Sequence, residues 1–220
     1  MAQTQQLDTF DKFQLFFDKH QRTIIIVATA VLLVVAGLFY FRNFYLPKQE
    51  EKAQVALFNA QNAFEQDSFQ VALNGAGEKL GFLQVIKDYN YTKAANLAHA
   101  YAGISYLRLK DYDKAIEHLQ DFDGENTVIG AVAIGALGDA YSQKNQMDKA
   151  IESYKKAATY KGDAFSAPIF LLKAALALEV QGKYKEAQEQ LETLKENYPD
   201  FEKEMGTVDK HLARVSQLAK

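Results

Sequence analysis

The sequence predicts an all-α protein, in which one transmembrane helix near the N-terminus is followed by an α-solenoid of about four helix pairs and a C-terminal capping helix. Three observations support this fold class. A stretch of 19 residues carries no charged side chain, and segments of similar sequence recur at intervals of 35 and 37 residues. Helix breakers are scarce, with 12 Gly and 3 Pro in 220 residues. No alternating run of β-branched residues lies between turn signals, so strands are not expected.

The uncharged stretch runs from Thr23 to Phe41 and is bracketed by Arg22 and Arg42. At the helical rise it spans about 28 Å, close to the thickness of the hydrocarbon core of a bilayer. A buried core helix is rarely apolar on every face, and no cleavage site of small residues follows the stretch, as a signal peptide would require. Aromatic residues gather at its C-terminal end, as they do at membrane interfaces. We therefore predict an uncleaved membrane anchor over residues 23–45.

Residues 1–22 form a tail before the anchor. Phe10, Phe13 and Phe17 recur in this tail at helical spacing, with charged residues between them. The pattern predicts a short amphipathic helix that contacts the membrane surface or a partner, and a disordered tail is the alternative. Lys and Arg are equally frequent in the segments that flank the anchor, three against three. The positive-inside rule therefore does not decide the orientation of the anchor.

Residues 46–220 form the predicted repeat domain, and three of its segments align with one another. Each segment has a small residue in its first helix and an alanine in its second helix. These pairs are Gly103 with Ala115, Gly138 with Ala150, and Ala175 with Ala187. Small residues at these positions allow the two helices of a pair to cross closely, and larger residues fill the space between pairs. The spacing resembles the tetratricopeptide repeat, although the aromatic residue that opens the repeat pattern is missing in all three copies.

The chain on either side of these copies is also predicted to be helical. A helix from about Lys48 to Gln66, the start of a second helix at Phe69, and a helix from about Leu80 to Tyr89 indicate a further pair with an expanded loop. After Pro199 an amphipathic stripe indicates a capping helix, which a stack of repeats needs at its end. The stripe consists of Val208, Leu212, Val215 and Leu218.

Composition argues against several classes of function. The segment from residue 46 onward has 21 Lys and Arg against 25 Asp and Glu, a net charge of −4, so nucleic-acid binding is not expected. The chain has no Cys, which excludes disulfides and thiolate zinc sites. No catalytic, cofactor-binding or metal-binding motif is found, and we expect no enzyme activity. Gly75, Gly77 and Gly81 indicate a flexible turn, because no strand is predicted to precede them as a phosphate-binding loop requires.

The first helices of a tetratricopeptide array line its concave surface, and the resemblance therefore implies where a partner would bind. The candidate groove residues are Leu97, Ile104, Leu107, Arg108, Asp139, Gln143, Leu172 and Leu176, with Val132, Ser142 and Ile169 at neighbouring positions. Much of this surface is apolar, which two hypotheses explain. Either the groove binds a polypeptide, with Arg108 and Asp139 setting the polarity, or the capping helix or a neighbouring subunit fills it.

A short tail, a single anchor, an Ala- and Gln-rich linker helix and about four divergent repeats together resemble the YfgM-like family, an ancillary subunit of the bacterial SecYEG translocon. The resemblance implies an inner-membrane protein with a cytoplasmic N-terminus and a periplasmic repeat domain. It implies a chaperone-like accessory that works on exported proteins beside the translocon and a membrane-anchored periplasmic prolyl isomerase. Two alternatives remain open, namely an envelope assembly or cell-division scaffold and a cytosol-facing tetratricopeptide receptor.

Overall fold

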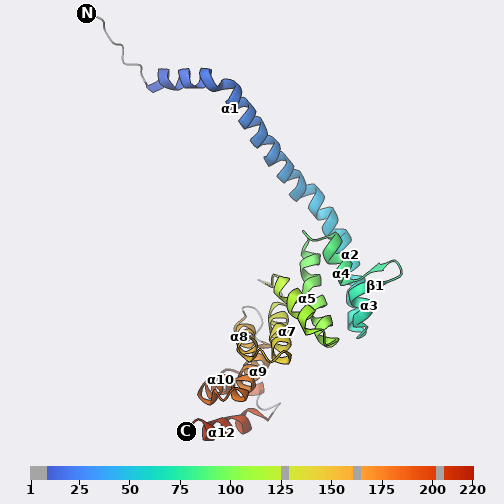
Figure 1. Ribbon diagram of the computed structural model, residues 1–220, viewed down its shortest axis with the longest axis vertical. Coiled ribbons are helices and arrows are strands. Elements are labelled where there is room, and N and C mark those ends of the chain that lie inside the picture. The colour runs from blue at the N-terminus through green and yellow to red at the C-terminus, as the bar shows by residue number, and fades with distance from the viewer. Residues whose placement is uncertain (1–8, 125–128, 161–164, 202–205) are drawn as a thin grey trace, which may run out of the picture. The chain divides into compact units, whose positions relative to one another are not determined.

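The computed structural model describes residues 9–124, 129–160, 165–201 and 206–220 (Figure 1). The chain divides into two compact units, Met1–Gln49 and Glu50–Lys220. The first unit contains helix α1, Thr9–Tyr40, and the short π-helix η1, Phe41–Tyr45. Helix α2, Leu46–Glu65, begins in the first unit and contributes its remaining residues to the second.

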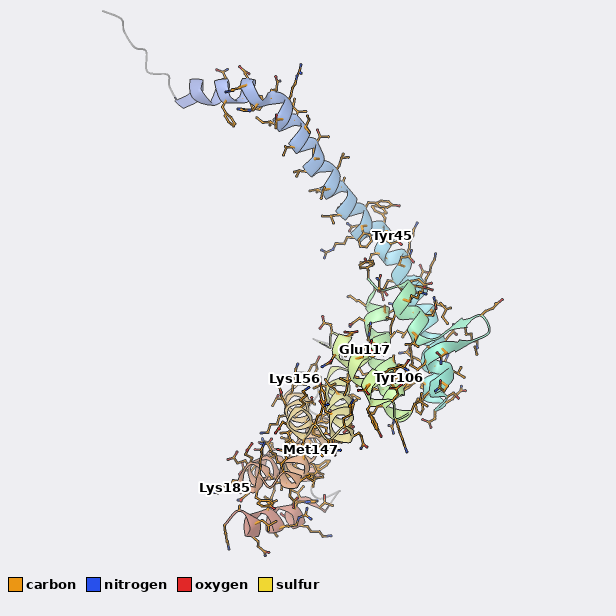
Figure 2. All side chains as sticks on the ribbon, in the orientation of Figure 1. Tyr45, Tyr106, Glu117, Met147, Lys156 and Lys185 are labelled. Carbon is orange, nitrogen blue, oxygen red and sulfur yellow. The ribbon has the colours of Figure 1, made fainter. Side chains whose placement is uncertain are left out.

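The apolar part of α1 is exposed to its surroundings on all sides, as Figure 2 shows by the side chains that project around it. Ile26 and Leu33, for example, are 68% and 69% exposed. A core helix of a water-soluble protein would be mostly buried, whereas none of the most apolar 18-residue window is buried here. The helix is long and apolar enough to cross a membrane, by its length and composition.

The π-helix η1 brings aromatic rings together at the end of the apolar stretch. The backbone N–H of Leu46 donates to the carbonyl oxygen of Phe41, five residues earlier, which is the wide turn of a π-helix. The rings of Tyr40 and Phe44 stack with centroids 5.8 Å apart, and those of Phe41 and Tyr45 with centroids 5.4 Å apart. The sequence predicted a helix here, but it did not predict the change from α-helix to π-helix.

The repeat domain is built from helices that pack pairwise, as the sequence predicts. The three aligned copies form the pairs α5 and α6, α7 and α8, and α9 and α10 (Figure 1). Their bounds are Lys93–Arg108 and Tyr112–Asp121, Gly130–Gln143 and Met147–Ala158, and Ala167–Val180 and Tyr184–Asn197. Each second helix also packs against the first helix of the next pair, so consecutive pairs share one continuous stack. The all-α solenoid is thereby confirmed.

Small residues lie at the helix crossings, where the alignment places them. A Cβ atom added to Gly103 would lie 2.5 Å from Cγ of Leu119, and one added to Gly138 would lie 2.6 Å from Cε1 of Tyr154. Both distances are shorter than any van der Waals contact, so a larger residue would push the two helices of the pair apart. Ala115, Ala150 and Ala187, on the opposing helices, are fully buried.

One turn recurs at the end of every first helix and identifies a fourth helix pair. The backbone is left-handed at Lys110, Asn145 and Gly182, and the N–H of the following residue donates to a carbonyl five residues back. The same turn occurs at Asp67, where the N–H of Ser68 donates to the carbonyl of Ala63. Helix α2 is therefore the first helix of a pair, and helix α3, Phe69–Asn74, begins its second helix.

The predicted expanded loop of this pair contains a small hairpin instead of a flexible turn. Strands β1, Gly75–Ala76, and β2, Lys79–Leu80, pair antiparallel, and helix α4, Phe82–Asp88, follows. The expectation that the chain has no strands is therefore wrong here. Glycine makes the hairpin possible, because Gly75 has a φ of +82° and a Cβ at Gly81 would lie 2.3 Å from the carbonyl oxygen of Leu73.

The capping helix α12, Val208–Leu218, packs against α10 at the C-terminal end. Val208 and Val215 are fully buried in the core that α12 shares with α9 and α10, and Leu212 packs against the edge of this core. Leu218, the last member of the predicted apolar stripe, is 50% exposed instead. It is the last residue of the helix, where no opposing helix covers it among the described residues.

Candidate functional site

The first helices of three successive pairs enclose a cavity of about 750 Å³, which we call the inner groove. Its walls come from the C-terminal half of α5, the exposed face of α7 and the N-terminal half of α9, together with parts of the adjoining turns and helices. The lining residues are Ile104, Leu107, Arg108, Lys110, Tyr112, Val132, Ala136, Asp139, Ser142, Gln143, Tyr154, Ser166, Ile169, Phe170 and Lys173. No residue of α10 or α12 lines it in the described structure.

Five of the eight candidate groove residues predicted from the sequence line this cavity. They are Ile104, Leu107, Arg108, Asp139 and Gln143. The neighbouring positions Val132, Ser142 and Ile169 line it as well. The regular spacing of the repeats explains this result, because equivalent residues of α5, α7 and α9 face the same side of the stack.

The three other candidate residues lie elsewhere. Leu97 lines a separate cavity of about 610 Å³ with residues of α2, among them Val55 and Phe58. Leu172 is partly buried and packs against the core that α7 to α10 share with α12. Leu176 is also partly buried, and it lines neither the inner groove nor the cavity at Leu97. The apolar surface of the inner groove is therefore smaller than the sequence predicted. Ile104, which does line the groove, is only 9% exposed.

The most exposed apolar side chains in the inner groove belong to two residues of successive first helices. Val132 of α7 is 43% exposed and Ile169 of α9 is 41% exposed. Behind them, Phe170 is buried against the backbone of α7, where a Cβ on Gly135 would lie only 1.9 Å from its ring. The absence of a side chain at Gly135 therefore lets α9 approach α7 closely at the floor of the groove.

Asp139 is held by two neighbouring residues. Lys173 Nζ lies 2.7 and 2.8 Å from the two oxygens of Asp139, and the Tyr154 hydroxyl donates to one of them at 2.8 Å. Burial raises the pKa of Tyr154, and the Asp139 carboxylate raises it further, so this hydroxyl stays protonated and continues to donate. Asp139 was expected to set the polarity of the groove together with Arg108, but its charge is offset by Lys173.

Lys110, Tyr112, Tyr154, Phe170 and Lys173 line the groove although the sequence did not indicate them. Lys110 lies in the turn after α5, and Tyr154 belongs to a second helix, so the rule that first helices line the groove does not include them. Lys173 is the repeat equivalent of Ala136, 37 residues earlier, and the repeat period would have identified it if Ala136 had been included among the candidate positions.

Two histidines form a pair between α5 and α6, away from the groove. Nδ1 of His99 lies 3.3 Å from Nδ1 of His118, and the ring of Tyr106 stacks on His118 with centroids 5.4 Å apart. Burial lowers the pKa of both histidines, and for His118 the neighbouring His99 lowers it further. Within the residues that the structure describes, no group of three His, Asp or Glu side chains could hold a metal ion.

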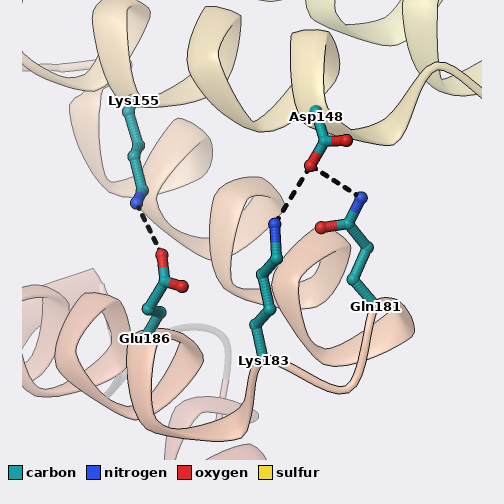
Figure 3. A network of polar contacts seen from close by, with 5 residues as sticks. All are labelled: Asp148, Lys155, Gln181, Lys183 and Glu186. Atoms are coloured by element: carbon teal, nitrogen blue, oxygen red, sulfur yellow. Dashed lines mark hydrogen bonds and ion pairs between the residues drawn. The ribbon is translucent and has the colours of Figure 1, made fainter.

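Polar contacts on the outer surface link helix α8 to α10 and to the turn that precedes it. Figure 3 shows Asp148 of α8 accepting hydrogen bonds from Lys183 at 3.0 Å and from Gln181 at 3.1 Å. Lys155 of α8 also pairs with Glu186 of α10 at 3.5 Å. The hydrogen bond from Lys183, followed by the one from Gln181, lowers the pKa of Asp148. Charged residues on these helices therefore contact the next repeat as well as solvent.

The predicted aromatic site in the tail is only partly described. The side chains of Phe10 and Phe13 lie outside the described residues, although the backbone of both belongs to α1. Phe17 is 40% exposed. The tail and the apolar stretch form one continuous helix over Thr9–Tyr40.

Comparison with known families supports the repeat assignment. Two family models of the tetratricopeptide repeat match the chain, one at residues 131–163 and the other at residues 101–123 and 170–200. These ranges contain most of the three aligned helix pairs. No curated protein matches the chain. The chain thus carries tetratricopeptide repeats, which form protein-interaction modules with an extended concave binding surface.

Proposed function

We propose that this chain is a single-pass membrane protein that binds segments of other proteins in the inner groove and catalyses no reaction. The observation that carries the proposal is the groove itself. Three successive first helices enclose about 750 Å³ of space, into which Val132 and Ile169 expose apolar surface that no described helix covers. An exposed apolar surface with a polar rim is typical of a site that binds another protein.

The membrane anchor is supported by the first unit of the chain. Helix α1 is long and apolar enough to cross a bilayer, and its apolar part is exposed throughout. The aromatic residues of η1 follow the apolar stretch, at the depth where aromatic rings favour the interface between lipid and water. In this arrangement the bilayer supplies the apolar surroundings that the rest of the protein does not provide.

We further propose that the groove serves newly exported proteins beside the SecYEG translocon, with the N-terminus in the cytoplasm and the repeats in the periplasm. The order of the tail, anchor, linker helix and divergent repeats supports this role through its resemblance to the YfgM-like family. A membrane-anchored periplasmic prolyl isomerase is then an expected partner. An envelope scaffold would share the groove but not contact the translocon, and a cytosol-facing receptor would have the opposite topology.

Site-specific crosslinking tests the groove in the full chain embedded in its membrane. A photoreactive amino acid at Val132 or Ile169 should form crosslinks to other proteins when the membranes are illuminated. Val71 and Val180 are matched controls, because they are apolar and 43% and 73% exposed but do not line the groove. Equal crosslinking from all four positions would contradict binding in the groove.

Topology and partner are tested separately. Protease added to spheroplasts should digest the repeat domain while the N-terminal tail stays protected. Purification of the full chain in mild detergent should recover the translocon channel together with it. A protected repeat domain would favour the cytosol-facing receptor, and recovery of the chain without the channel would favour the scaffold.

A further inference from the structure

The inner groove contains more positive than negative charge, although the domain is acidic. Arg108, at the end of α5, and Lys110, in the turn that follows, are both exposed and line the groove. Neither has an ion-pair partner within the described residues. The carboxylate of Asp139 is paired with Lys173. Among the described residues that line the groove, three cations thus face one anion, whereas the chain from residue 46 onward has a net charge of −4.

The free cation at Lys110 differs from the lysines in the two turns that follow. Lys144, in the turn after α7, pairs with Asp113 of the preceding helix pair. Lys183, in the turn after α9, pairs with Asp148 at 3.0 Å. These two lysines contribute to the stack of repeats, and their charges are offset by carboxylates of the same chain. Lys110 has no such role in the described structure, so its charge remains available to a ligand.

The arrangement of these charges around apolar residues indicates the chemistry of the ligand. Val132 and Ile169 offer apolar surface in the same cavity as Arg108 and Lys110. Nucleic acid would need more cations and exposed aromatic rings for base stacking. A polypeptide that carries both carboxylates and apolar side chains matches the groove better, because each kind of group finds its counterpart.

We infer that the inner groove selects segments of partner proteins in which Asp or Glu accompanies apolar residues. The inference rests on the proposed function, and it specifies in addition that the bound segment carries negative charge. Arg108 and Lys110 would contact the carboxylates, while Val132 and Ile169 would contact the apolar side chains. Segments with Lys or Arg at the same positions would be repelled, which gives the groove a preference among otherwise similar apolar segments.

A peptide library tests this inference with the full chain in detergent micelles. The library consists of 12-residue synthetic peptides with fixed Leu positions and with Asp, Glu, Asn, Gln, Lys or Arg at the remaining positions. Peptides that the chain retains are sequenced and compared with the input library. We expect enrichment of Asp and Glu over Lys and Arg, and weaker retention at high salt, because salt screens exposed charges.

The double variant Arg108→Glu/Lys110→Glu should reverse this preference. We expect it to bind a retained acidic peptide about tenfold more weakly, since each exposed ion pair contributes modestly and reversal of the charge adds repulsion. The variant Lys87→Glu/Lys185→Glu is the control for net charge, and Lys185 of α10 is labelled in Figure 2. Both control residues are exposed and lie outside the groove. Circular dichroism verifies that both variants fold.

The outcomes distinguish this inference from the function on which it rests. The retained peptides could depend on Val132 and Ile169 for binding and yet show no enrichment of Asp and Glu. This result would overturn the inference and leave the proposed function in place. An acidic preference that persists in the Arg108→Glu/Lys110→Glu variant would also overturn it. If no peptide is retained in a groove-dependent manner, both the inference and the proposed function are wrong.

Discussion

Asp139 of α7 and Lys173 of α9 form an ion pair in which Lys173 Nζ lies 2.7 and 2.8 Å from the two carboxylate oxygens. The pair joins the first helices of two neighbouring repeats across the inner groove. Tyr154 of α8 donates to the same carboxylate at 2.8 Å, so that one aspartate connects three helices. Asp139, which the sequence analysis assigned to partner binding, is therefore engaged in contacts within the chain.

The variant Asp139→Asn should therefore be less stable than the natural chain. About a third of each side chain of the ion pair is exposed, so solvent screening limits the loss to about 1 kcal/mol. In a domain of this size the thermal midpoint should fall by about 2–4 °C. Helical circular dichroism during heating measures the change, with the exposed Glu65→Gln variant as the control. An unchanged midpoint would show that the ion pair does not stabilise the stack.

The variant Gly135→Ala should weaken the contact between α7 and α9. The added Cβ would lie 1.9 Å from Cε1 of Phe170, and such overpacking typically costs about 1–3 kcal/mol. Adding Phe170→Leu should recover part of this loss, because the clashing ring is removed. Gly37→Ala is the control, since nothing lies within 4 Å of its added Cβ. Thermal unfolding of Gly135→Ala, Phe170→Leu, their double variant and Gly37→Ala measures the coupling, and a double variant that loses the sum of the two single losses would contradict the clash.

The variant Gly182→Ala should be destabilised through its backbone alone. Gly182 has a φ of +72° and no atom within 4 Å of an added Cβ, so alanine loses about 1 kcal/mol to left-handed strain. Asn145 occupies the equivalent turn with a φ of +57°, which predicts a smaller loss for Gly182→Asn. Chemical denaturation should therefore give the largest free energy of unfolding for the natural chain, a smaller one for Gly182→Asn and the smallest for Gly182→Ala. Equal stability of the two variants would contradict the backbone explanation.

Stability should also decrease in mild acid because of the histidine pair. Burial lowers the pKa of His99 and His118 in the folded chain, so the unfolded chain binds protons more readily. This contribution to stability is complete above the ordinary histidine pKa of about 6.5 and is lost as the pH falls below it. Asp121 and Glu117 oppose the effect of burial on both histidines, while Lys114 adds to the lowering at His118.

The double variant His99→Gln/His118→Gln tests this dependence. Between pH 7.5 and pH 5.5 the natural chain should lose more stability in chemical denaturation than the variant loses. Carboxylates titrate in both proteins, so their contribution cancels in the difference. Parallel pH profiles of the two proteins would exclude the histidine pair as the cause.

The fold could largely be predicted from the sequence because its determinants are local and periodic. The spacing between Gly103 and Gly138 indicated the helix crossings, and the uncharged stretch after Arg22 indicated the long apolar helix. The hairpin could not be predicted in the same way. The hairpin depends on the positive φ of Gly75 and on the close approach of Gly81 to the backbone of Leu73. Neither the backbone angle nor the contact across the loop follows from a periodic sequence pattern.

The site was predicted less completely than the fold. Arg108 and Gln143 line the inner groove because the repeat period carries equivalent positions to the same face. Leu172 packs against the core instead, and its repeat equivalent Gly135, 37 residues earlier, does not line the groove either. Lys173 and its repeat equivalent Ala136 do line the groove, and the pairing of Lys173 with Asp139 changes the charge balance there.

By itself, the sequence determined that this protein has an apolar N-terminal helix, four helix pairs and a capping helix, because hydrophobic periodicity and small residues at fixed intervals specify these features residue by residue. Only the tertiary structure decided which charges remain free in the groove. Asp139 and Lys173 are 34 positions apart, and whether they neutralise each other depends on how neighbouring helices rotate when their side chains pack. The same packing left Arg108 and Lys110 without a carboxylate partner in the described part of the chain.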